Sequence, residues 1–60
     1  MLVLKRKLGE RIVVTVGMTV IEIEVCDVGG SWAKIGVAAS HEVAIHRKEV
    51  QELIDKGQLQ

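Results

Sequence analysis

Basic side chains gather at two points of the chain and are the residues best suited to bind an anionic partner. Lys5, Arg6 and Lys7 close an apolar N-terminal run, and His46 and Arg47 close a second one. A planar guanidinium can contact a phosphate or a base edge through two hydrogen bonds, so the arginines are the stronger candidates. Each cluster has an equally good ordinary explanation as solvated charge, on an edge strand or at the start of a helix.

The charge distribution is uneven although the chain as a whole is neutral. Eight basic residues balance eight acidic ones. Residues 1–11 hold four basic residues and one acidic residue, whereas residues 12–45 hold one basic and four acidic. A basic N-terminal segment on a neutral body predicts a focused electropositive patch.

The polar residues do not form a recognisable catalytic motif. Ser31 and Ser40 could act as nucleophiles and His41 and His46 as bases, but no nucleophile elbow, phosphate loop or metal-ligand spacing accompanies them. Cys26 is the only cysteine, which excludes an internal disulfide, and we expect it to be a small, at least half-buried hydrophobic residue. We therefore expect no enzymatic activity, no metal and no cofactor.

Trp32 is the only aromatic residue of the chain. On the alternation of its segment it shares a face with Lys34, which predicts an exposed position. A Trp beside a Lys can stack on a nucleic-acid base. It can also cover a hairpin or join a protein contact, and we favour that structural interpretation.

Alternating apolar and polar residues predict a mostly β fold with a C-terminal helix. Residues 19–25 show the pattern most clearly, with isoleucine and valine on one face and glutamate on the other. Helical spacing of apolar residues begins after His46. We predict one domain over residues 1–60 with the order β-β-β-β-β-α, comprising strands at 1–7, 11–16, 19–25, 32–37 and 42–46, a helix at 47–56 and a short tail.

A chain of 60 residues is too short to build a large hydrophobic core by itself. A 60-residue domain buries only about 60% of the surface that its unfolded chain exposes. A second copy could supply both the missing core and partners for the exposed sheet edges, so we expect a homodimer. No apolar run reaches the length of a signal sequence core or of a membrane span, so we expect a cytoplasmic protein without membrane contact.

Three stretches together resemble the carbon storage regulator family (CsrA, also called RsmA). They are MLVLKRKLGE at 1–10, KIGVAAS at 34–40 and EVAIHRKEV at 42–50. The resemblance covers nearly the whole chain. It implies five strands and a C-terminal helix, interlocked as a homodimer with a β-barrel-like core.

The resemblance also implies a function and partners. Members bind GGA motifs in hairpins of the 5′ leaders of messenger RNA near the ribosome-binding site, which represses translation or alters message stability. Such regulation affects carbohydrate metabolism in the family. Small regulatory RNAs rich in GGA titrate its members, and in some bacteria a flagellar assembly protein antagonises them.

The implied RNA site joins the first strand of one chain to the end of the fifth strand of the other. The residues that carry over by position are Leu4, Lys5, Arg6, Ala39, Ser40, Val43, Ile45, His46 and Arg47. Ser40 stands where the family usually has proline. The alternative to RNA regulation is a protein-interaction module of the same fold with weak RNA affinity.

Overall fold

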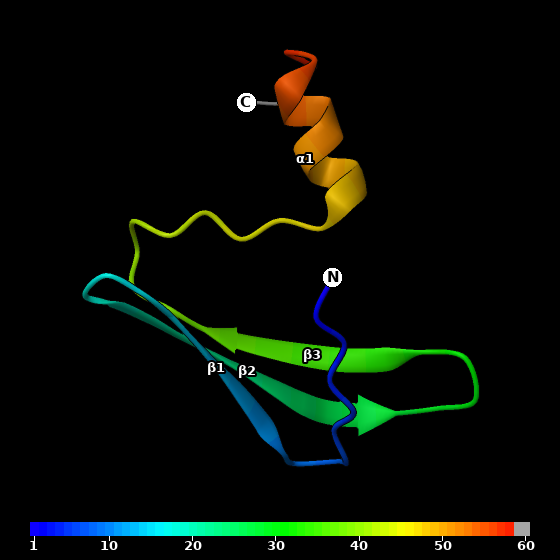
Figure 1. The fold of residues 1–60 in the computed structure, drawn as a ribbon. Helices are drawn as coiled ribbons and strands as arrows, with labels where there is room; N and C mark the ends of the chain where they lie inside the picture. Colours follow the sequence, from blue (N-terminus) through cyan, green and yellow to red (C-terminus); the bar gives the residue numbers. More distant parts are fainter. Residues whose placement is uncertain (59–60) are drawn as a thin grey trace.

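The computed structural model describes residues 1–58, which form a three-stranded antiparallel sheet followed by one helix (Figure 1). The strands are β1 (Arg11–Val16), β2 (Thr19–Val28) and β3 (Ala33–Ala38), in the order β1-β2-β3. The helix α1 spans Lys48–Asp55. The predictions of strands at 11–16, 19–25 and 32–37 and of a C-terminal helix are confirmed, while residues 59–60 of the predicted tail lie outside the described residues.

A two-residue turn joins β1 to β2. Val16 pairs with Thr19, so only Gly17 and Met18 lie between the strands, and Gly17 has φ of 59°. Tight hairpins favour glycine at the first turn position because the twist of the strands requires a positive φ there. This turn sets the register of the whole β1–β2 pair.

Replacing Gly17 with alanine is expected to lower the free energy of unfolding by about 1–2 kcal/mol, since an L side chain is strained at positive φ. A Cβ at Gly17 meets no atom within 4 Å, so the cost is confined to the backbone. Gly30→Ala is the matched control, because Gly30 also has open space but lacks a positive φ. Urea unfolding at one fixed protein concentration measures both, and equal losses would contradict the assignment.

The β2–β3 pair contains one bulge. Val25 pairs with Ile35 and Asp27 with Lys34, which leaves Cys26 as the extra residue on β2. The expectation that Cys26 is at least half-buried is wrong, because its side chain is exposed. The alternation of β2 places Cys26 on the same side of the strand as Glu22 and Glu24, where it lines an open hollow.

The registers of the two strand pairs divide the sheet into an apolar and a charged face. Ile23 lies opposite Ile12 on one side and Val37 on the other. The next row contains Arg11, Glu24 and Gly36 and belongs to the opposite face. The apolar face, as the term is used below, consists of Ile12, Val14, Val16, Ile21, Ile23, Val25, Val28, Ala33, Ile35 and Val37.

Nothing within residues 1–58 covers this apolar face. No hydrophobic side chain in the described part of the chain is fully buried, and Ile35 is 52% exposed. The radius of gyration is 13.6 Å, against about 10 Å for a compact 60-residue domain. The single chain therefore lacks a closed core.

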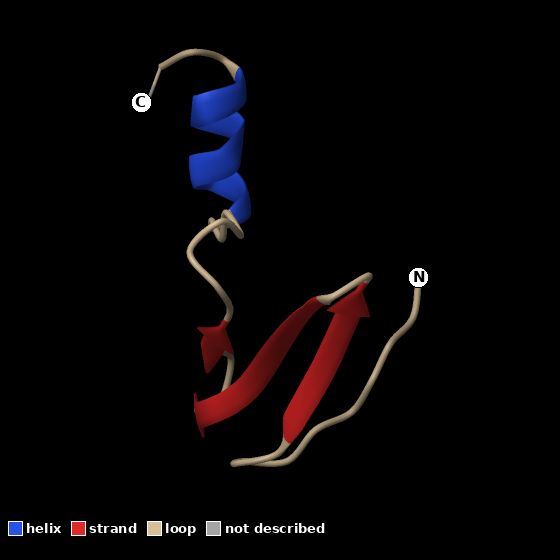
Figure 2. Cartoon of the chain, turned by 90° about the vertical axis from the view of Figure 1, so that its left-hand side faces the viewer, coloured by secondary structure: helices blue, strands red, loops and turns tan. Residues whose placement is uncertain are grey.

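The predicted strands at 1–7 and 42–46 are not found in the sheet. Residues 1–7 form no regular element, and the segment after β3 contains a turn at 41–43 followed by irregular backbone. Figure 2 shows the N-terminal segment as a loop beside the sheet. A strand requires a hydrogen-bonded neighbour, and in one chain these apolar segments have none.

Helix α1 stands apart from the sheet (Figures 1 and 2). Among the described residues it contacts none of the three strands. Its apolar side, which holds Val50, Leu53 and Ile54, is partly exposed, Leu53 by 40%. The predicted bounds of 47–56 are one residue too long at each end, since Arg47 is the N-cap and Lys56 the C-cap.

Within residues 1–58, no helix has the length and apolar character to cross a membrane.

Candidate functional site

The first basic cluster lies at a turn that leads into the sheet. Glu10 N–H donates to the Lys7 carbonyl (3.0 Å), and Gly9 N–H donates to the Val25 carbonyl of β2 (2.8 Å). Gly9 has φ of 83°, which a glycine adopts without strain. The turn therefore fixes the basic cluster beside the start of β1.

Glu10 organises the basic cluster. Its Oε1 accepts a hydrogen bond from the Lys7 N–H (2.7 Å) and lies 3.5 Å from Arg6 Nη2. The Arg6 guanidinium also donates to two main-chain carbonyls, those of Lys5 (3.0 Å) and Arg11 (3.4 Å). These bonds orient a guanidinium whose side chain is 38% exposed. Arg6 is thus held in place yet accessible to an anion.

Arg47 occupies the junction between the irregular segment and the helix. It is the N-cap of α1, with extended backbone (φ −60°, ψ 147°) and no hydrogen bond from its side chain to the cap. Its guanidinium pairs with Glu49 and is 82% exposed. Exposed ion pairs contribute only about 0–1 kcal/mol, so a phosphate can displace Glu49 at little cost.

The segment between β3 and α1 begins with a hydrogen-bonded turn. Val43 N–H donates to the Ser40 carbonyl (3.1 Å), and the Ser40 hydroxyl donates to Glu42 Oε1 (2.7 Å). Ile45 is 48% exposed, and His46 is exposed as well. Of the nine predicted site residues, only Ala39 and Val43 are half-buried.

The Ser40 hydroxyl lowers the pKa of Glu42 below its ordinary value, with a smaller contribution from the main chain of Glu42. A bond to the ionised carboxylate favours the charged form. The stabilisation of the turn by the Ser40–Glu42 hydrogen bond is therefore complete above the ordinary pKa of a glutamate. It is lost as the pH falls through the lowered pKa of Glu42.

Ser40→Ala is expected to raise the pKa of Glu42 toward its ordinary value, because the hydroxyl that stabilises the carboxylate is removed. A pH titration of the Glu42 carboxyl carbon by NMR measures this change. Ser31→Ala, which removes the other serine hydroxyl of the chain, serves as the control. An unchanged Glu42 titration in Ser40→Ala would contradict the hydrogen bond.

The structure does not bring the two basic clusters together within one chain. Among the described residues, Arg6 bonds only to residues 5–11, and Arg47 pairs with Glu49. Among the hydrogen bonds and ion pairs seen in residues 1–58, none joins the N-terminal segment 1–7 to residues 39–47.

Sequence reasoning missed the two carboxylates that organise these segments. Glu10 follows Arg6 by four residues, and Glu42 follows Ser40 by two. The first spacing suits an ion pair across a turn, and the second suits a hydroxyl–carboxylate bond. Either spacing could have been noticed in the sequence.

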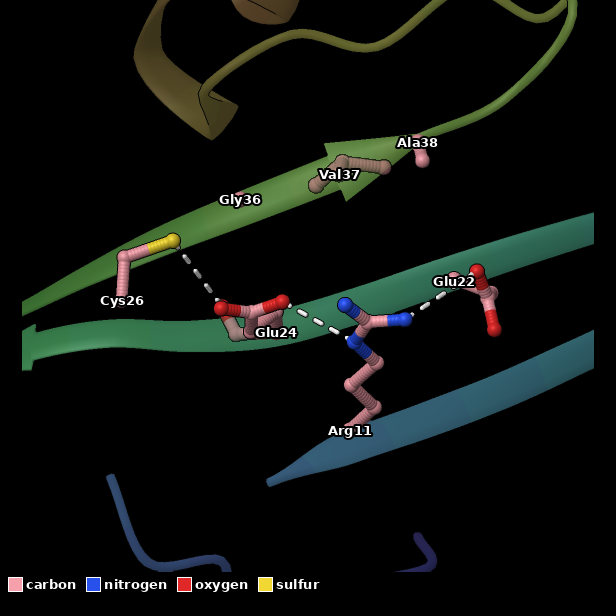
Figure 3. A pocket seen from close by; sticks show the side chains of 7 residues that line it. All are labelled: Arg11, Glu22, Glu24, Cys26, Gly36, Val37 and Ala38. Carbon is pink, nitrogen blue, oxygen red and sulfur yellow. Dashed lines mark hydrogen bonds and ion pairs between the residues drawn. The ribbon is translucent and has the colours of Figure 1, made fainter. Parts of the chain in front are cut away.

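The charged face of the sheet carries a shallow open hollow of about 280 Å³ (Figure 3). Arg11 crosses from β1 to pair with Glu24 (2.9 Å) and Glu22 (3.8 Å) of β2. Cys26 lies at its margin. Two carboxylates against one guanidinium leave this hollow unsuited to a phosphate, and it contains none of the predicted site residues.

Trp32 lies at the β2–β3 hairpin, where its indole covers Gly29. A Cβ added to Gly29 would come within 2.3 Å of the indole ring. The predicted exposure of Trp32 is confirmed, since 53% of the residue is accessible.

In the described part of the chain, no three His, Cys, Asp or Glu side chains lie close enough together to hold a metal ion.

Comparison with known proteins supplies the remaining observation. The sequence model of the CsrA global regulator protein family matches residues 1–56. A translational regulator CsrA from Shouchella clausii is 46% identical over 56 residues, which cover 93% of this chain and 67% of that protein. A translational regulator CsrA from Rhodopirellula baltica is 41% identical over 57 residues, which cover 95% of this chain and 77% of that protein.

Proposed function

The chain belongs to the CsrA family of global regulator proteins, and we propose that it is a translational regulator that binds GGA motifs in messenger RNA. It acts in the cytoplasm on leader hairpins near the ribosome-binding site, where the bound protein blocks ribosome entry or alters message stability. Residues 1–60 serve as one RNA-binding domain. The names of both relatives state translational regulation, which supports this role.

The binding unit is an interlocked homodimer. Strands β1 and β3 each have one free edge, and the chain has two apolar segments, 1–7 and 42–46, that lack a strand partner. A second copy can add these segments to the free edges and receive the same in return. Each protomer then contributes five strands to a closed, barrel-like core.

The exposed surface supports this assembly. The chain exposes 5454 Å², whereas a folded monomer of its mass exposes about 3,900 Å². The excess is roughly 1,500 Å² for each chain, or about 3,000 Å² for two, which falls within the range of obligate homodimer interfaces. The uncovered apolar face accounts for a large part of that excess.

Dimerisation places the two basic clusters in one site. In the family arrangement, the first strand of one protomer meets the end of the fifth strand of its partner, so Arg6 and Arg47 from different chains bind the same RNA. Main-chain groups of these segments read the base edges, which requires no aromatic platform. The proposed site consists of Leu4, Lys5 and Arg6 from one chain and of Ala39, Ser40, Val43, Ile45, His46 and Arg47 from the other.

The observation that carries the proposal is the state of the two arginines. Both are exposed, and each lies in or next to a segment without a strand partner. Among residues 1–58, the one carboxylate that pairs with each arginine belongs to a glutamate nearby in the sequence. A phosphate can replace either glutamate, and affinity should fall as salt rises because counterions are released from the RNA. The two sites of a symmetric dimer can also engage paired GGA motifs, as in small regulatory RNAs that titrate the protein. A flagellar assembly protein is a candidate antagonist.

Cell-free translation tests the function. Adding the protein should repress a message that carries GGA in a leader hairpin, and should leave unchanged the same message with the triplet replaced. Equal effects on both messages, or none, would overturn the proposal and favour a protein-interaction module.

A further inference from the structure

The turn that leads into the proposed RNA-contacting residues has no glycine or proline to set its backbone. The chain contains no proline, and no glycine occurs between Gly36 and Gly57. The turn is closed instead by two short-range bonds, Val43 N–H to the Ser40 carbonyl and the Ser40 hydroxyl to Glu42 Oε1. Of these two bonds, the one between the Ser40 hydroxyl and Glu42 joins side chains, whereas the other joins main-chain groups.

The position of Glu42 is unusual for a residue beside an anion-binding segment. Its carboxylate is fully exposed and lies five residues before Arg47. Electrostatics alone disfavours a negative charge near phosphates. Its hydrogen bond with Ser40 at 2.7 Å offers a compensating role, because bonds to an ionised acceptor are stronger than neutral ones.

We propose that Ser40 and Glu42 are positioning residues for the RNA site, whose mutual hydrogen bond fixes the turn from which residues 43–47 extend. The inference rests on the proposed function and names residues that act through the main chain of this turn. The fixed turn reduces the ordering that the segment would otherwise undergo when RNA binds. The lowered pKa of Glu42 agrees with a carboxylate that stays charged at neutral pH.

Glu42→Gln separates positioning from simple charge. Removing a negative charge should strengthen RNA binding if charge alone matters. The positioning role predicts instead a loss of roughly three- to tenfold in affinity for a GGA hairpin, because the amide holds the hydroxyl less firmly. Glu52→Gln is the matched control, since it removes an exposed carboxylate from α1, outside the turn.

A double-mutant cycle shows whether Ser40 acts through Glu42. Ser40→Ala should weaken binding by a similar factor, and the double variant should be no worse than either single one. Ser40→Pro, which fixes φ without the hydroxyl, should recover part of the loss, because no main-chain hydrogen bond seen in residues 1–58 is donated by Ser40 N–H. Ser31→Ala should leave affinity unchanged.

Hydrogen exchange at the Val43 amide tests the same turn in the protein without RNA. Both single variants should speed this exchange, since Val43 N–H closes the turn. Unchanged exchange, additive losses, or tighter binding by Glu42→Gln would each overturn the inference. If the unaltered protein does not distinguish GGA from a changed triplet, the proposed function fails, whereas the exchange result still shows whether the turn depends on Ser40 and Glu42.

Discussion

Arg47→Ala should weaken binding to a GGA hairpin by roughly 10- to 100-fold, the cost of losing an arginine that contacts a base or phosphate. The substitution should leave the fold intact, because within residues 1–58 the Arg47 side chain pairs only with Glu49 at the surface and makes no cap hydrogen bond. The slope of affinity against salt should also fall by about one contact. Fluorescence anisotropy with a labelled hairpin at several salt concentrations measures both quantities.

Two further variants show that the position of Arg47, and not overall charge, causes the loss. Arg47→Lys keeps the charge but lacks the planar fork, so it should recover only part of the affinity. Lys56→Ala removes one positive charge at the far end of α1 and should change affinity little. If Lys56→Ala weakens binding as much as Arg47→Ala, the site assignment is wrong.

Ile23→Glu should abolish the folded dimer. Ile23 lies in the middle of the apolar face, between Ile12 and Val37, where a partner copy would bury it. An unpaired charge in such an interface costs on the order of 3–5 kcal/mol, and each dimer would contain two. Light scattering should show loss of the dimer mass, and circular dichroism should show loss of strand signal.

Thr15→Glu is the control for this substitution. Thr15 lies on the charged face of the same sheet, opposite Val20. The substitution therefore introduces the same charge on a face where no partner copy is expected to pack. It should keep the dimer and most of the stability. A protein that stays folded and dimeric with Ile23→Glu would show that the apolar face is not the interface.

The strand predictions succeeded where consecutive segments pair through short turns, and they failed for the two segments that have no strand neighbour in residues 1–58. Ile21, Ile23 and Val25 alternate with two glutamates, and such alternation fixes both the strand and its faces. The segments 1–7 and 42–46 have equally apolar sequences. Whether they become strands depends on a neighbour, which the sequence of a single chain does not supply.

The residues of the candidate site come from the sequence, and their role in RNA binding stays a prediction, whereas the contacts that hold them were not predicted. Motif resemblance identified Arg6 and Arg47, and the structure shows both to be accessible. The roles of Glu10 and Glu42 became visible only with the turns that bring each carboxylate to its partner. The expected burial of Cys26 was wrong because the alternation of β2 places it beside Glu22 and Glu24 on the exposed side of the strand.

The most direct test of the central claim is a titration of the protein with a hairpin RNA that carries GGA in its loop, alongside the same hairpin with the triplet changed. The mass of the protein and of the complex is measured in parallel. We expect tight binding to the first hairpin only, by a dimer that takes up two hairpins. Equally weak binding to both hairpins, vanishing as salt rises, would contradict sequence-specific RNA recognition by this chain.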